Sequence, residues 1–189
     1  MKTKLLILAI ILTSLISCVS FDRKMIKDDF IKLNDENLNE LNGKYQFSGY
    51  QNISPSRTKS DKSRSISEML SVDKKYNTSY SHCEVNIEKN KKSKNIVAKF
   101  KFFKNDSLGY SFQYNAKISN GILILKNNTT HCDSLPYLLG GCRTFQSSIG
   151  LTKEKNLWIQ DFFTNDGAFI FFFWAGYTIN YTEKFEKIN

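Results

Sequence analysis

The chain has 189 residues and a formal net charge of +9 at pH 7, from 27 Lys and Arg against 18 Asp and Glu. This length allows one domain with its own hydrophobic core. The positive charge comes almost entirely from dispersed Lys residues, without a run of Lys and Arg long enough for a nucleic-acid-binding arm. The composition therefore argues against a nucleic-acid partner.

The first 17 residues have the three parts of a secretory signal peptide. Lys2 and Lys4 precede an uninterrupted apolar run over 5–12, and small polar residues follow that run. The run is shorter than the roughly 20 residues that a transmembrane helix needs. We therefore predict a cleaved signal peptide over 1–17, with a permanent transmembrane anchor as the less favoured alternative.

The sequence Leu-Ile-Ser-Cys at 15–18 resembles the lipobox of bacterial lipoproteins. The resemblance implies that Cys18 receives a diacylglycerol, that cleavage occurs before Cys18, and that a further acyl chain such as palmitate is added to the new amine. Several acyl chains hold a protein firmly on a membrane, whereas one binds only marginally. Val19, in place of Asp, implies the outer membrane; we predict its periplasmic face, with surface exposure as the alternative. Asp-Ser-Leu at 106–108 and 133–135 resembles the O-glycosylation sequon of exported Bacteroidetes proteins.

Residues 18–34 are predicted to be the lipidated Cys and a tether. Within this segment Ile26, Phe30 and Leu33 are spaced as on one face of a helix, with Asp and Lys between them. We therefore expect a short N-terminal helix, followed by a single β-rich domain over 35–189.

Most of the remaining chain alternates apolar and polar residues, as strands with one buried face do. Two long loops are expected, at 53–71 and at 127–141, and Ile66, Met69 and Leu70 could form a helical turn in the first. Asn120-Gly121 predicts a tight hairpin, and Asn165 to Gly167 a turn. About nine strands are predicted, at 44–50, 79–88, 95–104, 110–118, 122–125, 143–150, 156–163, 168–174 and 177–181. The fold class is therefore all-β, mainly antiparallel.

Gly43-Lys44-Tyr45, preceded by a helical turn, resembles the start of lipocalin-type domains, in which the first strand carries Gly-x-Trp. Tyr45 stands where that motif has Trp. The resemblance implies an up-and-down barrel with room for one ligand. A curled sheet or a sandwich is the alternative. The sequence at 169–174 is apolar on both faces, so a helix, another sheet, a partner or a ligand must cover its outer face.

Three cysteines remain after Cys18, and an exported protein can form disulfides. Cys132 and Cys142 are ten residues apart in a predicted loop, so we expect a disulfide between them, with a bridge from Cys83 to either as the alternative. His82 and His131 each precede a cysteine, which raises the possibility of a zinc site. Adjacent residues of a strand point to opposite faces, so we predict no metal.

The sequence shows no nucleophile with a base and an orienting acid, and no phosphate-binding loop. We therefore predict a protein that is not an enzyme and has no cofactor. The preferred function is an envelope lipoprotein, bound to the membrane by its lipid, that binds a hydrophobic or amphipathic ligand in a β-barrel. The alternative is an interaction or structural lipoprotein (an inhibitor, an immunity protein or an accessory subunit) that binds an envelope protein through loops 53–71 and 127–141.

Overall fold

The structure is a computed structural model that describes residues 21–56, 58–60, 63–72, 79–90, 95–135, 139–169 and 173–188. For residues 60, 134, 135, 139, 140, 167–169 and 173–175 it describes the backbone alone. The predicted signal peptide and Cys18 lie outside these ranges, so the expected cleavage and lipidation concern a part of the chain that is not described.

The described chain forms twelve strands, and all of them belong to one sheet. Its order is β12-β1-β4-β5-β6-β7-β9-β10-β11-β2-β3, with β8 paired to β9, and every pairing is antiparallel. The prediction of an all-β, antiparallel fold is confirmed. The strands are β1 (Gly43–Gln46), β2 (Gln51–Ile53), β3 (Lys59–Ser60), β4 (His82–Lys89), β5 (Ile96–Lys104), β6 (Ser107–Ser119), β7 (Ile122–Leu125), β8 (Thr129–Leu135), β9 (Leu139–Leu151), β10 (Leu157–Phe169), β11 (Phe173–Phe185) and β12 (Lys187–Ile188).

The sheet curls strongly but stays open. β12 follows β11 after Glu186 and pairs with β1, while β2 and β3 extend the sheet on the other side of β11. No ladder joins β12 to β3 among the described strands, so the closed lipocalin-like barrel is wrong for this part of the chain. The curled sheet, which was the alternative, is the observed arrangement.

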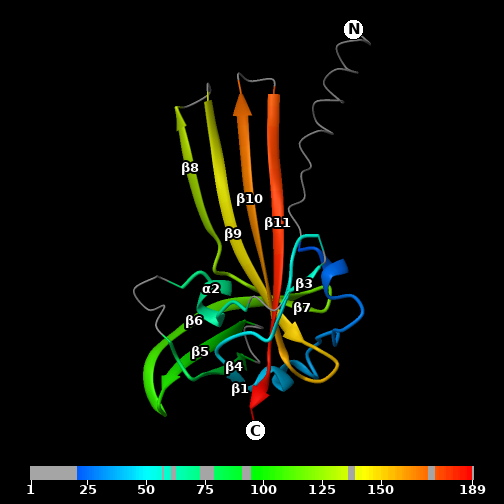
Figure 1. The fold of residues 1–189 in the computed structure, drawn as a ribbon, viewed down its shortest axis with the longest axis vertical. Coiled ribbons are helices and arrows are strands. Elements are labelled where there is room, and N and C mark those ends of the chain that lie inside the picture. The colour runs from blue at the N-terminus through cyan, green and yellow to red at the C-terminus, as the bar shows by residue number, and fades with distance from the viewer. Residues whose placement is uncertain are drawn as a thin grey trace.

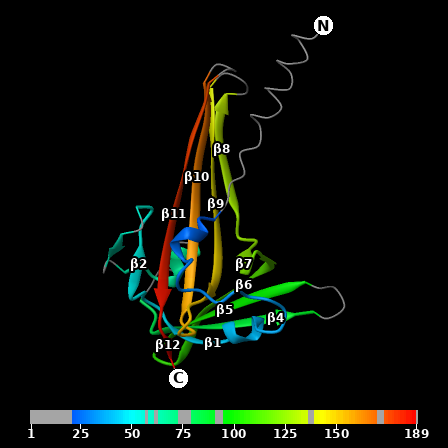
Figure 2. The ribbon, with the colours of Figure 1, turned by 90° about the vertical axis from the view of Figure 1, so that its right-hand side faces the viewer.

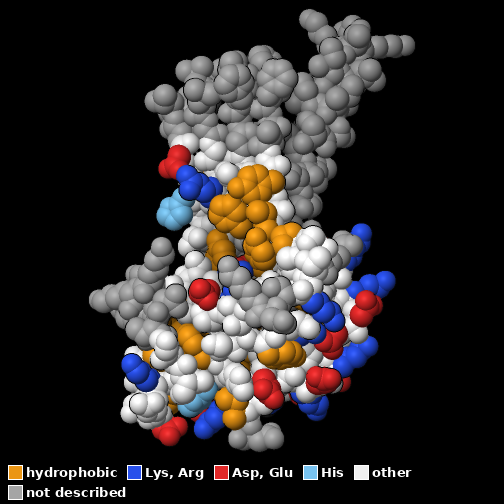
Figure 3. Space-filling view, viewed as in Figure 1, with side chains coloured by type: hydrophobic (Ala, Val, Ile, Leu, Met, Phe, Trp, Pro, Cys, Tyr) orange, Lys and Arg blue, Asp and Glu red, His pale blue; other side chains and the backbone are white. Residues whose placement is uncertain are grey.

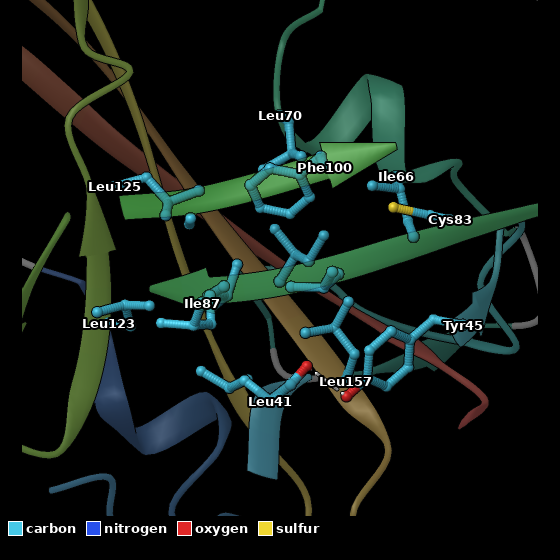
Figure 4. Packing of buried hydrophobic residues seen from close by; sticks show 14 of the residues in the cluster. Leu41, Tyr45, Ile66, Leu70, Cys83, Ile87, Phe100, Leu123, Leu125 and Leu157 are labelled. Atoms are coloured by element: carbon cyan, nitrogen blue, oxygen red, sulfur yellow. Dashed lines mark hydrogen bonds between the residues drawn. The ribbon is translucent and has the colours of Figure 1, made fainter. Parts of the chain in front are cut away.

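The core lies inside the curl, where β1 and β4–β7 bend around the lower ends of β9–β11 (Figure 1). Alternate residues of β4 and β5 are buried, which is the pattern that the sequence predicted. Figure 4 shows Leu157 beside Tyr45, and Phe100 beside Leu70 in the same cluster. The Tyr45 hydroxyl donates a hydrogen bond of 2.9 Å to the Leu41 carbonyl. Aromatic and aliphatic side chains therefore fill the space inside the curl.

Two short helical segments cover the ends of this core. The 3₁₀ turn η2 (Leu38–Leu41) buries Leu38 and Leu41. The helix α2 (Ile66–Met69) begins with a capping box between Ser65 and Glu68. Ile66, Met69 and Leu70 are all buried, so the helical turn predicted within loop 53–71 is confirmed.

The Asn120-Gly121 hairpin joins β6 to β7 as predicted. Its two residues have φ angles of 54° and 83°, the left-handed conformation that Asn and Gly adopt most readily. In contrast, Asn165 to Gly167 do not form the expected turn, because they pair with both β9 and β11 inside β10. At Gly176, opposite Asp166, a Cβ atom would lie 2.2 Å from a carboxylate oxygen of Asp166, so the close pairing requires glycine there.

β8, β9, β10 and β11 form a long ribbon that projects away from the core (Figures 1 and 2). β9, β10 and β11 have 13 residues each. The prediction of a loop at 127–141 is wrong. β8 and the first residues of β9 occupy most of this range and pair with each other at seven positions. The Pro and Gly residues of this stretch led to the prediction of a loop, whereas its two halves pair with each other as a hairpin of adjacent strands.

The N-terminal segment 21–34 packs against the protein rather than hanging free. Ile26 and Trp158 are buried in one cluster, and the Ile31 amide donates a 2.8 Å hydrogen bond to the Leu151 carbonyl. The only helical piece is the 3₁₀ turn η1 (Arg23–Met25), shorter than the expected helix. The described part of the predicted tether, 21–34, is therefore part of the domain, because its apolar residues cover one face of β10.

We expect Ile26→Ala to lower the free energy of unfolding by about 2–5 kcal/mol, since it leaves a cavity beside Trp158. Lys27→Ala, at the neighbouring exposed position, is the matched control and should change stability little. Urea denaturation measures both. Equal stability of the two variants would mean that segment 21–34 behaves as a free spacer.

Candidate functional site

Side chains of β9, β10 and β11 that share a row of the sheet form successive layers on one face of the ribbon, here called the inner face. Next to the core the first layer is Leu151, Leu157 and Phe185, all fully buried. Moving away from the core, the next three layers are Ile149, Ile159 and Glu183; Ser147, Asp161 and Tyr181; and Phe145, Phe163 and Ile179. Strand alternation thus places a polar zone between the core and a second apolar layer.

The polar zone is covered by α2 and by the residues just before it. The Ser147 hydroxyl donates a 2.8 Å hydrogen bond to the Met69 carbonyl. Arg64, which precedes α2, lies with Nη2 3.1 Å from Asp161 Oδ2 and with its guanidinium carbon 5.2 Å from the centroid of the Tyr181 ring. Asp161 is 5 % exposed and the Arg64 side chain is 29 % exposed, so this ion pair is partly buried.

Glu183 is the second buried carboxylate in this zone. Asn52 Nδ2 donates a 2.7 Å hydrogen bond to Glu183 Oε2, and the other carboxylate oxygen is buried without a hydrogen-bond partner in the described chain. Gly49 lies against it so closely that a Cβ atom there would be 2.1 Å from Glu183 Oε1. Arg64 Nη1 is likewise buried and without a partner in the described chain. The zone therefore holds polar atoms that the described fold does not satisfy.

Burial is the main influence on both carboxyl groups, because it disfavours the charged form. It raises the pKa of Asp161 to about 6, although the Arg64 guanidinium opposes this rise. It raises the pKa of Glu183 to about 7, against the hydrogen bond from Asn52. Both groups thus change charge in the range between mildly acidic and neutral pH.

Beyond the polar zone no described helix or strand covers the inner face. Phe145, Phe163 and Ile179 are half-buried, and Tyr177 in the next row is 51 % exposed. Figure 3 shows hydrophobic side chains gathered on this part of the ribbon, above the body of the protein. We call Phe145, Phe163, Tyr177 and Ile179 the apolar patch.

A shallow hollow of about 330 Å³ lies at the upper margin of the apolar patch, against Phe163 and Tyr177. Asp133, Gly141, Arg143 and Asn165 line the rest of it. Arg143 Nη2 and Asp133 Oδ2 are 3.0 Å apart, and both side chains are well exposed. The apolar patch therefore has polar groups on two sides, the partly buried Arg64–Asp161 pair below and the exposed Arg143–Asp133 pair above.

The opposite face of the ribbon is covered by segment 21–34. Gln160 Nε2 donates a 2.9 Å hydrogen bond to the Asp22 carbonyl, and the rings of Phe21 and Phe162 meet edge to face with centroids 4.9 Å apart. Of the two faces, the inner one therefore offers the accessible apolar surface.

The cysteines and histidines singled out in the sequence do not form a common site. Cys132 and Cys142 form a disulfide across β8 and β9, with an S–S distance of 2.07 Å. Cys83 is buried in the core, and burial raises the pKa of its thiol. His82 stacks on Phe103 with ring centroids 4.8 Å apart, and His131 is exposed on β8. Within the described ranges, no group of three or more His, Cys, Asp or Glu residues could hold a metal ion.

Arg64, Asp161 and Glu183 were not identified as site residues from the sequence. The sequence does hold one signal for Asp161: in an alternating strand it falls on the same face as Leu157 and Phe163. Arg64, its partner, lies in a predicted loop far away in the sequence, so the pairing itself has no local signal.

No protein-family model matches the chain, and comparisons with curated proteins and with solved structures give no significant match. No helix of the described residues is both long and apolar enough to cross a membrane. The functional argument therefore depends on the geometry of the ribbon.

We expect Asp161 and Glu183 to make the free energy of unfolding larger at about pH 5 than at about pH 8. Their pKa values in the folded protein, about 6 and about 7, lie above the ordinary 3.8 and 4.5. The folded state therefore binds more protons than the unfolded chain, and the stability gained at low pH is lost as pH rises through the raised values. Glu183→Gln should raise the free energy of unfolding at the higher pH by about 1–3 kcal/mol and weaken the pH dependence.

Urea denaturation at both pH values measures these effects. Glu36→Gln, at an exposed site, is the matched control and should leave the pH dependence unchanged. A Glu183→Gln variant that is less stable than the natural chain at the higher pH would contradict the assignment.

Proposed function

We propose that this protein is a non-catalytic lipoprotein of the bacterial outer membrane that binds a hydrophobic or amphipathic ligand on the inner face of its ribbon. The observation that carries this proposal is the uncovered apolar patch beside a buried polar zone. Exposed contiguous apolar surface is typical of binding sites. The barrel interior proposed from the sequence is replaced by this patch, since the core side chains fill the space inside the curl.

The chemistry of the site suits an elongated amphipathic molecule. Phe163, Ile179 and Phe145 offer an apolar floor for a chain or ring system. Arg143 and Asp133 at the upper margin are exposed and can exchange their mutual ion pair for a polar head group at small cost, because exposed ion pairs contribute little stability. The absence of a nucleophile–base pair among the described patch residues favours binding over catalysis.

An envelope protein partner is the second candidate, supported by the edges of the ribbon. β11 pairs with β2 only at Thr182–Lys184, so no described strand pairs with the outer edge of its preceding residues. β8 is the last strand on the other side. Free edges of this kind accept an extended segment of another protein. The edges of β8 and β11, rather than loops 53–71 and 127–141, are then the sites of contact.

We expect Phe163→Gln to weaken binding of a fluorescent fatty acid by about tenfold, since a buried Phe contributes about 1.5–3 kcal/mol. The experiment uses the chain from Val19 onward, secreted behind a cleavable signal and purified without detergent. Leu108→Gln is the matched control, because Leu108 is an apolar residue on β6 that is 55 % exposed and far from the patch in the sheet order. Lack of saturable binding by the natural chain, or equal loss in both variants, would refute the ligand site.

We expect Cys18→Ser to abolish the lipid modification and to release the protein from the outer-membrane fraction, since the thiol is the acceptor of the diacylglycerol. Intact-mass measurement of the natural protein should show the added acyl chains on a mature chain that begins at Cys18. A Cys18→Ser variant that still fractionates with the outer membrane would show that something other than lipid holds the protein there.

A further inference from the structure

The described ends of β8 and β10 and the beginnings of β9 and β11 lie at the end of the ribbon farthest from the core (Figures 1 and 2). The last described pairs at this end are Leu135 with Leu139 and Phe169 with Phe173, and Phe169 also pairs with Leu139. These four residues therefore occupy one row across all four strands. Every position of this last row, here called the terminal row, is a large apolar residue.

The sequence around the terminal row lacks charge. Residues 134–142 and 167–182 contain no Asp, Glu, Lys or Arg, although charged residues make up 24 % of the chain. The stretch from Phe169 to Trp174 consists of aromatic residues and one Ile. An uncharged apolar segment is inexpensive to place among acyl chains, and Trp and Tyr are enriched where a protein crosses the membrane interface.

The described N-terminal segment runs toward this same end when it is followed backward from Ile26. Ile26 packs beside Trp158, the Asp22 carbonyl accepts a hydrogen bond from Gln160, and Phe21 contacts Phe162. Each step moves along β10 toward Phe169. The described chain therefore begins, at Phe21, beside a residue of β10 that is closer to the terminal row than Trp158 is.

The distances along the chain allow the lipid on Cys18 and the terminal row to contact the same membrane. Three residue steps separate Cys18 from Phe21 and reach at most about 10 Å. From Phe162 to Phe169 the strand rises over seven residue steps, about 23 Å. The terminal row therefore extends roughly 13 Å beyond the reach of Cys18. A protein held by lipid on Cys18, with its ribbon pointing toward the membrane, would place the end of the ribbon within the leaflet that holds the acyl chains.

We infer that the end of the ribbon, at the terminal row of Leu135, Leu139, Phe169 and Phe173, inserts into the lipid leaflet that anchors Cys18. The inference rests on the lipid anchor of the proposed function. A bilayer is favoured over a protein partner because the row and its flanks lack charge and because only three residue steps separate the proposed lipid on Cys18 from Phe21 on the ribbon.

The test uses the two tryptophans of the mature chain. Trp158 is fully buried near the base of the ribbon, and Trp174 follows the terminal row on β11. The full lipidated protein is reconstituted into phosphatidylethanolamine–phosphatidylglycerol vesicles with and without brominated acyl chains, which quench Trp at membrane depth. We expect strong quenching for the natural chain and none for Trp174→Phe, whose remaining Trp158 stays inside the protein.

Equal emission of the natural chain in brominated and unbrominated vesicles would overturn the inference. A blue-shifted Trp174 emission that brominated chains do not quench would also overturn it, and would show that protein covers the ribbon end. Flotation of the same samples separates this failure from failure of the anchor, because a chain that floats with vesicles but is not quenched retains the lipid anchor and lacks insertion.

Discussion

The continuous pairing of β9, β10 and β11 is the constraint on which the rest of the structure depends. Their 13-residue ladders begin in the core at Leu157 and continue past the body of the protein. Since side chains alternate along every strand, one face of this ladder must serve the core, a polar zone and an open apolar patch in turn. The other face is covered by segment 21–34, so the sheet joins the N-terminus to the candidate site.

The buried Asp161 and Glu183 are costly features of this arrangement. Carboxylates without full solvation destabilise a fold unless partners compensate, and Arg64 and Asn52 do so only in part, since atoms of Glu183 and Arg64 lack partners in the described chain. Apolar residues at these two positions would stabilise the fold more than the carboxylates do. Such groups are retained most often where a site needs polarity next to apolar surface, which agrees with the proposed function.

The sequence predicted those elements whose causes are local. Asn120-Gly121 makes its hairpin because both residues tolerate left-handed backbone, and Ile66, Met69 and Leu70 share one helical face. Asn165 to Gly167 have equally good turn chemistry, yet they are held in β10 by partners on both neighbouring strands. The pairing of Arg64 with Asp161 also joins residues far apart in sequence. Long-range pairing therefore decided both the misplaced turn and the overlooked site.

The packing of Phe21 on Phe162 has a further consequence for binding. Three residue steps lie between Cys18 and the packed domain, so a lipid-anchored copy can explore only a thin layer next to the membrane. For the proposed lipid anchor on Cys18, a ligand dissolved in the same leaflet would meet the apolar patch at a high effective concentration, because a short connection confines both to a small volume. Modest intrinsic affinity for an amphipathic molecule would then suffice for occupancy at the membrane, while the same protein in free solution would bind that molecule weakly.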